Sequence, residues 1–305
     1  MFVIKYRKIF FALSGLLILG SILSVVMIGF HYSTDFVGGS LLEVSYLDGQ
    51  RPDLAELNTQ LSELSSINLG AFTLRPTGTN NYTLRSREIS AQEKTQIESV
   101  LSKGNTLEIK EQRFNSVGPV VGQDLKHKSF IAIGIVALCI VLFITFAFRK
   151  VSQPVASWKF GFATIIALAH DVVIPTGIYI VFGKYFGAEI DLLFITALLA
   201  ILGYSVHDTI VVFDRVRENL RHNQEYRNKE DFEVTVGKSV SQTFGRSINT
   251  SLTIFLTLLA LLLVGSPATR DFSFTLLVGV VIGTYSSIFV ASPLLVTLEK
   301  LQKKN

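Results

Sequence analysis

The sequence "IDLLFITALLAILGYSVHDTIVVFDRVREN", residues 190–219, joins a long apolar run to a charged end. The part from 192 to 213 is long enough to cross a bilayer, which takes about 20 residues of helix. Two ionisable residues, His207 and Asp208, interrupt this run. An ionisable side chain at membrane depth costs at least ~2.5 kcal/mol and is usually paired, in a cavity or functional. The stretch therefore predicts a membrane helix that carries a functional acid.

The composition extends this interpretation to the whole chain. Of the 305 residues, 49% are hydrophobic and 17% are charged, and a soluble domain has roughly 25% charged residues. Apolar runs long enough to span a bilayer occur at 9–30, 130–148, 160–182, 192–213, 248–264 and 272–298. The fifth run is short, and we expect its helix to start a turn earlier, near Thr243. The chain is thus predicted to be a polytopic α-helical membrane protein with six transmembrane helices.

Three further features narrow the class of protein. The first apolar run is longer than the roughly 7–15 apolar residues of a cleaved signal peptide and no A-x-A site follows, so we interpret it as a retained anchor. Cys139 is the single cysteine, which excludes an internal disulfide. The net charge is +4 and the basic residues flank apolar runs, so we expect no nucleic-acid partner.

Basic residues predict the orientation in the membrane. They cluster at both termini and in the connections after the second and fourth spans, whereas the connections after the third and fifth spans hold only Lys184 and Arg270. Since Lys and Arg collect on the cytoplasmic side, we expect residues 1–30 to form a cytoplasmic N-terminus and the first helix. Residues 31–128 form an extracytoplasmic domain, and residues 129–305 form five helices with a cytoplasmic loop at 214–246 and a cytoplasmic C-terminus.

The segment 40–115, between the first two spans, has the composition of a soluble domain. Apolar patterning predicts strands at 40–47, 67–76, 81–89 and 106–114 and helices at 51–64 and 90–103. Pro52 suits the first turn of the first helix, and Ser90 with Glu93 has the spacing of a capping box. The order βαββαβ predicts an α+β ferredoxin-like domain. We find no catalytic or metal-ligand set in it and expect a folded module, which could bind an extended chain at a sheet edge.

Asp208 is the first candidate site residue inside a span. Tyr204 and Ser205 precede it by four and three residues and share its helix face. Arg246 enters the membrane on the next helix from the same side, so Asp208 and Arg246 are natural ion-pair candidates. Pairing favours the ionised acid and desolvation favours the neutral acid. An aspartate balanced between these effects can load and release a proton.

Arg246 begins a polar stripe that continues through Asn249, Thr250 and Thr253 at helical spacing. Such a stripe suggests a helix face turned towards protein or water. The alternative for Arg246 itself is snorkelling towards the nearby membrane surface.

His170 and Asp171 are the second ionisable pair inside a span, with Pro175 as a possible kink shortly after them. They are either an accessory to a proton path or a structural contact between helices. His207 lies about 100° around the helix from Asp208, so it flanks that site without sharing its face. Gly279, Gly283 and Ser287 form a small-residue series that favours close helix packing.

Six motifs along nearly the whole chain resemble the SecF family, the smaller membrane component of the bacterial SecDF protein-export complex. They are "STDFVGGS", "VGPVVGQDL", "LAHDVVIPTG", "LGYSVHDTIVVFDRVREN", "GRSINTSLTIF" and "GTYSSIFVASP", in this order. The first includes Asp35, Phe36, Gly38 and Gly39 at the exit of the first helix. The family usually has a glycine where this chain has Ser33 and an asparagine where it has His207.

This resemblance implies an RND-related transport protein of the bacterial cytoplasmic membrane. It implies a SecD partner that completes a twelve-helix unit, and association with the SecYEG translocon and often YajC. The proton-motive force would then help to pull unfolded polypeptides across after ATP-driven translocation by SecA. The acid and arginine of the proton path match Asp208 and Arg246. Neither a cofactor, a metal nor an enzymatic activity is implied.

Other functions remain open at this stage. The helices could form a non-conducting scaffold that organises SecD and the translocon. A proton-driven RND-type exporter of small molecules is also possible, although one small external domain offers little room for a substrate pocket. An intramembrane hydrolase would need a nucleophile, a base and an orienting group, and we find no convincing set of these in the sequence.

Overall fold

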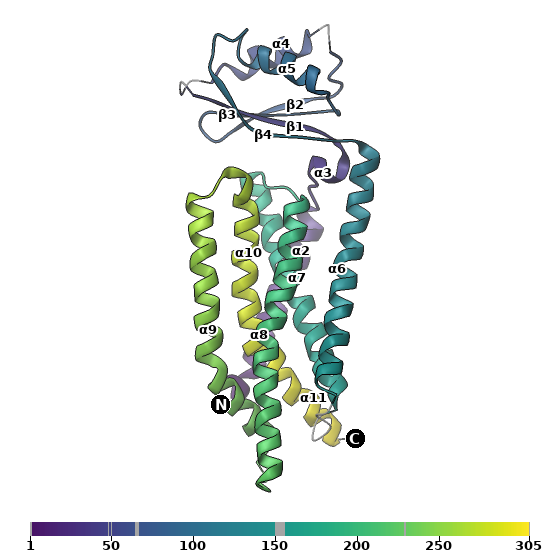
Figure 1. Cartoon of the computed structure of the whole chain (residues 1–305), viewed down its shortest axis with the longest axis vertical. Helices are drawn as coiled ribbons and strands as arrows, with labels where there is room; N and C mark the ends of the chain where they lie inside the picture. The colour runs from purple at the N-terminus through teal and green to yellow at the C-terminus, as the bar shows by residue number, and fades with distance from the viewer. Residues whose placement is uncertain are drawn as a thin grey trace. The chain divides into compact units, whose positions relative to one another are not determined.

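The computed structural model describes residues 2–47, 49, 51–64, 67–149, 156–228 and 230–304 (Figure 1). Residues 150–155 and 229, in two connections that we expect to be cytoplasmic, lie outside the described residues. The chain divides into two compact units. The membrane unit comprises Met1–His31 and Ile131–Asn305, and the inserted domain comprises Tyr32–Phe130.

The membrane unit consists of helices. They are α1 (Phe2–Lys5), α2 (Arg7–Ile28), α6 (Pro119–Ala147, which begins in the inserted domain), α7 (Ser157–Phe186), α8 (Leu192–Glu225), α9 (Phe232–Val264), α10 (Pro267–Ser286), the π-helix η1 (Ser287–Ala291) and α11 (Ser292–Lys304). Six helices in the described part of the chain are long and apolar enough to cross a membrane, the last of them running from α10 through η1 into α11. This confirms the predicted six spans.

Helices α8 and α9, which contain the fourth and fifth spans, extend beyond the apolar runs. Helix α8 continues to Glu225, and α9 already begins at Phe232, so most of the predicted loop 214–246 is helical. The extension of α8 carries ion pairs at helical spacing, including Arg215–Glu218 at 2.6 Å and Arg221–Glu225 at 2.8 Å. Such pairs support a solvated helix. Hydropathy marks only the part of a helix that suits lipid, so it did not predict that the segment 214–246 is mostly helical.

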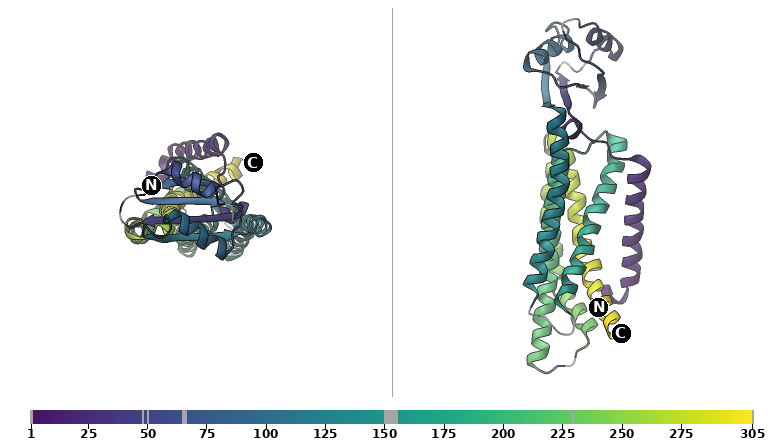
Figure 2. Two further views of the ribbon diagram at one scale, coloured as in Figure 1. Left: turned by 90° about the horizontal axis from the view of Figure 1, so that it is seen from above. Right: turned by 90° about the vertical axis from the view of Figure 1, so that its right-hand side faces the viewer.

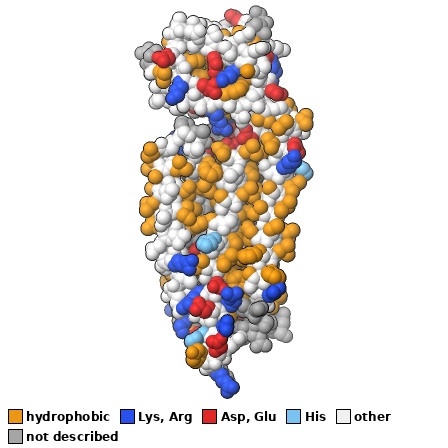
Figure 3. Space-filling model, viewed as in Figure 1, with side chains coloured by type: hydrophobic (Ala, Val, Ile, Leu, Met, Phe, Trp, Pro, Cys, Tyr) orange, Lys and Arg blue, Asp and Glu red, His pale blue; other side chains and the backbone are white. Residues whose placement is uncertain are grey.

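The long helices of the membrane unit run side by side (Figure 2), and α10 packs against α7, α8 and α9. Hydrophobic side chains cover the middle of the helices in Figure 3, and charged side chains gather at the end of α8. The core includes a group of aromatic rings in which Phe148 stacks on Phe160 at 5.2 Å and both meet Phe213 edge-on. This packing fixes the inner face of α8, on which the candidate acid lies.

The inserted domain begins with the short helix α3 (Thr34–Val37) and then has the predicted order βαββαβ. Its elements are β1 (Gly39–Tyr46), α4 (Leu54–Ser62), β2 (Thr73–Thr77), β3 (Asn81–Ser86), α5 (Ala91–Leu101) and β4 (Ile109–Val117). The sheet order is β2-β3-β1-β4, with every pair antiparallel. Leu42 and Val44 of β1 pack in one core with Leu57 of α4 and Ile97 of α5. The α+β ferredoxin-like prediction is confirmed.

Local turn chemistry explains where these elements begin. The capping box is present, because the Ser90 hydroxyl accepts from the Glu93 amide and the Glu93 carboxylate accepts from the Ser90 amide. Helix α4 begins at Leu54 with Asp53 as its N-cap, so Pro52 lies before the helix and its predicted place in the first turn is wrong. Strand β2 starts late, since Gly70 has φ +65° and its amide bonds to the Asn68 side chain.

Candidate functional site

Asp208 lies on the buried face of α8 and is 6% exposed. The hydroxyls of Ser247 on α9 and Ser287 in η1 face its carboxyl group. Neither forms a well-aligned bond with Oδ2, which has no hydrogen-bond partner within the described part of the chain. The Ser247 hydroxyl has no partner by the same criterion. The site therefore presents a buried carboxyl oxygen with unused hydrogen-bonding capacity next to hydroxyl groups, which suits the binding of a proton.

Arg246 does not pair with Asp208 in this structure. No ion pair between the two occurs among the described residues, and Arg246 is exposed on the outer side of α9. The next residue, Ser247, is 1% exposed. Because successive helix residues differ by about 100°, Ser247 takes the inner position and Arg246 points away. The expected ion pair within this chain is wrong, although the charge of Arg246 still acts on Asp208.

The other residues of the predicted polar stripe are exposed on the outer side of α9, as Arg246 is. Asn249, Thr250 and Thr253 are all exposed. The inner polar face of α9 consists instead of Ser247 and Ser251. Sequence reasoning missed these serines, although they follow Thr243 at intervals of four residues. The helix thus has two polar faces, one turned into this chain and one turned away from it.

Tyr204 belongs to a separate group of hydroxyls. Its hydroxyl lies 2.6 Å from that of Ser251 on α9 and 3.1 Å from that of Thr284 on α10. Ser251 and Thr284 are themselves 2.6 Å apart. This group connects α8, α9 and α10, and among the hydrogen bonds of the described residues none joins Tyr204 to Asp208.

His170 and Asp171 form a second buried acid site, on α7. The side chains of His170 and Asp171 are 1% and 0% exposed, and His170 Nδ1 lies 2.8 Å from Asp171 Oδ1. Asp171 Oδ2 accepts hydrogen bonds from the hydroxyls of Ser205 on α8 and Ser286 on α10, the latter at 2.6 Å. Ser205 therefore serves Asp171 and not Asp208. Helix α7 continues as one helix through Pro175.

The small residues of α10 allow it to approach α8 closely. A Cβ atom on Gly279 would lie 2.2 Å from Ile201 Cδ1, and one on Gly283 would lie 3.2 Å from Ser205 Cβ. The Ser287 hydroxyl lies 2.9 Å from that of Thr209. Gly279, Gly283 and Ser287 thus lie where α10 and η1 meet α8.

His207 lies on the opposite side of α8 from these contacts and is exposed. Gly203 and Ala200 are exposed on the same side, and nothing lies within 4 Å of the position of a Gly203 Cβ. Helices α8 and α9 are in contact. The outward side of α8 is small or polar at these positions, and α9 exposes the polar Arg246 and Thr250 beside the apolar Ile248 and Leu252.

The motif at the exit of the first helix lies within the inserted domain. The Ser33 hydroxyl caps α3 through the Asp35 amide at 3.2 Å, and Asp35 Oδ1 accepts a hydrogen bond from the Asn115 side chain. Phe36 is 2% exposed. Gly38 and Gly39 have φ +80° and +107°, values that side chains disfavour.

These two glycines also make close backbone contacts. A Cβ on Gly38 would lie 2.6 Å from Pro119 Cα, and one on Gly39 would lie 2.6 Å from the Ser86 carbonyl oxygen. The motif is therefore structural in this chain, since it connects α3 to β3 and to the start of α6. The unusual Ser33 provides a helix cap.

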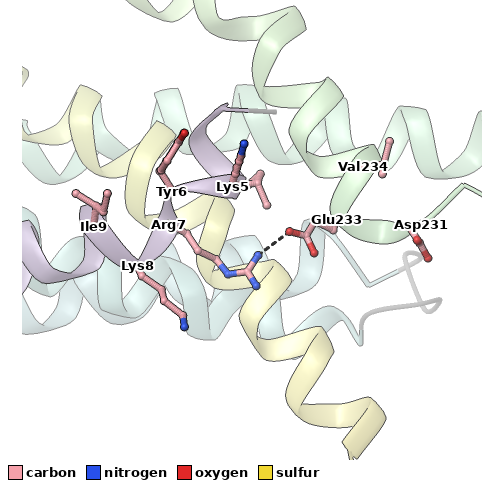
Figure 4. Close-up of a pocket in the computed structure, with 9 residues that line it drawn as sticks. Lys5, Tyr6, Arg7, Lys8, Ile9, Asp231, Glu233 and Val234 are labelled. Atoms are coloured by element: carbon pink, nitrogen blue, oxygen red, sulfur yellow. Dashed lines mark hydrogen bonds and ion pairs between the residues drawn. The ribbon is translucent and has the colours of Figure 1, made fainter.

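A pocket of about 500 Å³ lies between the N-terminal residues of the chain and the start of α9 (Figure 4). It is lined by residues 4–9, which include the N-terminal basic cluster, and by the start of α9. Arg7 reaches Glu233 across it at 2.9 Å, and Lys300 also pairs with Glu233. The pocket does not include Asp208 or Asp171. The ion pairs of Glu233 with Arg7 and Lys300 join α9 to α2 and α11.

These features together define a multi-pass membrane protein with the buried acids Asp171 and Asp208 inside its helices and one α+β domain between its first two spans. A family model described as "Protein export membrane protein SecD/SecF, C-terminal" matches residues 96–301. The protein translocase subunit SecF of Thermobaculum terrenum is 41% identical over 304 residues, covering 97% of this chain and 93% of the relative. SecF of Anaerolinea thermophila is 38% identical, covering 98% of this chain and 94% of the relative.

Solved structures of SecDF resemble the chain as well. The crystal structure of SecDF from Thermus thermophilus, described as translocon-associated, has a TM-score of 0.79 at 31% identity and covers 97% of this chain. A SecDF structure in the super-membrane-facing form has a TM-score of 0.67 at 31% identity. This chain spans 38% and 39% of those two chains. The chain belongs to the SecF family of protein translocase subunits.

Proposed function

We propose that this chain couples the movement of protons through the bacterial cytoplasmic membrane to a late stage of protein export. The observation that carries the proposal is the buried Asp208 carboxyl, whose Oδ2 has no partner beside the Ser247 and Ser287 hydroxyls. A membrane-embedded acid is expensive and is retained where it has a function. Binding and release of a proton at Asp208 changes its charge, and therefore changes the hydrogen bonds that α9 and η1 make with α8.

The outward faces of α8 and α9 support a proton path completed by a partner subunit. Arg246 and Thr250 are exposed on α9, and His207 is exposed on α8. Small and polar residues favour close association with other membrane helices. The SecDF chain from Thermus thermophilus is much longer than this chain, which spans 38% of it. We therefore propose SecD as the partner on this face, with Arg246 as the link between its acid and Asp208.

The wider assembly follows from the family. We propose that the pair acts with the SecYEG translocon, SecA and YajC on an unfolded polypeptide that is leaving the membrane, and that it transports without an enzymatic reaction. Positive charge at Lys5, Arg7 and Lys8 favours a cytoplasmic N-terminus. The inserted domain then lies on the far side of the membrane, where the exported chain emerges.

The energy available matches a modest conformational change. One proton that crosses a potential of 100 mV releases about 2.3 kcal/mol. A shift of two-state populations from 1:99 to 99:1 needs about 5.5 kcal/mol. One proton per cycle therefore biases a movement of the membrane helices without driving it to completion, and about three protons would be sufficient for a full switch.

The variant Asp208→Asn tests the proposal in cells that carry the full complex. It keeps the size and polarity of the side chain and removes proton binding, so late-stage export should fall while the amount of protein in the membrane stays unchanged. Asp214→Asn is the matched control, because Asp214 is exposed and pairs with Arg217 at the end of α8. Export by Asp208→Asn at the level of the control would favour a non-conducting scaffold instead.

A further inference from the structure

The membrane unit contains another buried acid, Asp171, that the proposed function does not use. Asp171 is fully buried and interacts with three side chains from three helices. They are His170 of α7, Ser205 of α8 and Ser286 of α10. Among the described residues, the only ion pair of Asp171 is with His170. Desolvation of a carboxylate costs several kcal/mol, so this arrangement calls for a reason beyond packing.

The hydrogen bonds around Asp171 suit its ionised form. An ionised carboxylate only accepts hydrogen bonds, and the two serine hydroxyls both donate to Asp171 Oδ2. His170 Nδ1 lies 2.8 Å from Oδ1 and donates to it when the carboxylate is ionised. In the neutral imidazole the other nitrogen, Nε2, then carries a lone pair.

His170 Nε2 has no hydrogen-bond partner in the described part of the chain, although the residue is only 2% exposed. The imidazole ring stacks on the Tyr285 ring with centroids 5.9 Å apart. The Tyr285 hydroxyl is occupied elsewhere, donating to the Phe10 carbonyl at 2.9 Å and lying 3.2 Å from the Ser14 hydroxyl, both on α2. A proton that binds Nε2 therefore breaks none of these hydrogen bonds.

Two interactions stabilise the protonated ring. Because the Asp171 carboxylate is adjacent, binding of the proton changes the net charge of the pair from −1 to 0. This loss of net charge favours proton uptake in a medium of low polarity. The face of Tyr285 lies within the roughly 6 Å at which an aromatic ring attracts a cation.

The second acid site is connected to the first by adjacent serines. Ser286 donates to Asp171, whereas the next residue, Ser287, lies beside Asp208 and 3.3 Å from the Ser205 carbonyl oxygen. Ser205 and Asp208 lie three residues apart on α8, on one face of the helix. The connection occurs where α10 passes into the π-helix η1, and π-helical turns are frequent at functional sites.

Ser286 also has a second acceptor. Its hydroxyl lies 3.0 Å from the Gly283 carbonyl oxygen and can turn to it when Asp171 becomes a weaker acceptor. Pro175 leaves the carbonyl of residue 171 without its usual helix hydrogen bond, because proline has no N–H. The hydrogen bonds around Asp171 can therefore rearrange without leaving Ser286 unpaired.

We propose that the His170–Asp171 pair is a second proton-binding site, with Nε2 of His170 as the atom that receives the proton and Asp171 as the counter-ion. The proton comes from the aqueous phase and returns to it, and no covalent bond other than N–H forms or breaks. The proposal rests on proton movement as the proposed function. It adds that α7, through this pair, senses the same protons as α8.

The experiment uses the full chain with its partner subunit in sealed vesicles. His170→Asn keeps a donor where Nδ1 lies and removes Nε2, so the pair can no longer bind a proton. We expect normal amounts of assembled complex, lower proton flux, and a midpoint of flux against pH that shifts by about one unit or more. His222→Asn is the control, since His222 is exposed near the end of α8.

A direct readout accompanies the flux. In the parent complex labelled with ¹⁵N-histidine, we expect one signal, absent in His170→Asn, that reports protonation of Nε2 between about pH 5 and 8. The proposal is overturned if that signal does not change with pH, or if His170→Asn has the flux and pH profile of the control. If Asp208→Asn retains full flux, the proposed function fails, and the ¹⁵N signal alone decides whether His170 binds a proton.

Discussion

At the scale of the residue, the direction of a side chain decides its role. Arg246 and Ser247 are neighbours in sequence, yet the serine faces the buried acid and the arginine points outward. Sequence alone placed Asp208 and Arg246 in the same membrane region from the cost of burying charge. It could not tell which residue of α9 faces Asp208, because both faces of that helix carry polar residues. For the same reason Ser205 was assigned to Asp208 although it binds Asp171.

Glu93 allows a prediction at the residue scale in the inserted domain. Hydrogen bonds from Arg87 and from the Ser90 amide lower its pKa from 4.5 to about 2. A lowered pKa in the folded state gives stability that is present above pH 4.5 and is lost as the pH falls towards 2. The parent inserted domain should therefore lose stability in this range relative to Glu93→Gln.

The measurement is urea unfolding of residues 32–118, monitored by circular dichroism at several pH values between 5 and 2. We expect the difference in the free energy of unfolding between parent and Glu93→Gln to shrink steadily as the pH falls. Glu63→Gln, outside the capping box, serves as the control. A difference that stays constant from pH 5 to 2 would show that the Arg87 and Ser90 bonds do not stabilise the ionised form.

At the scale of the element, apolar run length predicted the six spans and turn chemistry predicted the capping box of α5. The ends of helices α8 and α9 could not be predicted from apolar run length. Both helices continue beyond their apolar parts, where charged pairs and the packing of Leu220 and Phe232 stabilise them. The π-helix η1 was not predicted, because no local residue pattern distinguishes it from an α-helix. Its neighbours Ser286 and Ser287 became significant only once their partners on other helices were known.

Two glycines make the helix packing testable. Gly279→Ala would place a Cβ 2.2 Å from Ile201 at the contact of α10 with α8. Overpacking of this kind costs about 1–3 kcal/mol, so thermal unfolding of the purified chain should occur at a lower temperature. An unchanged melting temperature would mean that α10 and α8 are not in this contact.

Gly203 has the opposite environment, with nothing within 4 Å of its Cβ position. Gly203→Leu should leave the thermal stability of the isolated chain unchanged or slightly higher, because glycine disfavours helix by roughly 0.5–1 kcal/mol. The same change should weaken copurification of the partner subunit, since it fills the small outward face of α8. Copurification equal to that of the parent would place the partner elsewhere.

At the scale of the whole molecule, the chain corresponds to 38% of the SecDF chain from Thermus thermophilus. Its core holds the buried acids Asp171 and Asp208, which Ser205, Ser286 and Ser287 connect, and its outward side carries His207 on α8 and Arg246 on α9. The sequence motifs predicted the family across nearly the whole chain, which the SecF relatives confirm. The motifs could not predict that Asp171 and Asp208 interact with different serine side chains, because this depends on how α7, α8 and α10 pack.

The central claim is that Asp208 carries protons in transit. The most direct measurement is proton flux into sealed vesicles that contain the chain with its SecD partner, under an imposed membrane potential. Asp208→Asn should lower the flux by at least about a hundredfold, the lower range of what one positioned proton-transfer group contributes, while Asp214→Asn leaves it unchanged. Equal flux in Asp208→Asn and the parent, at equal amounts of assembled complex, would contradict the account.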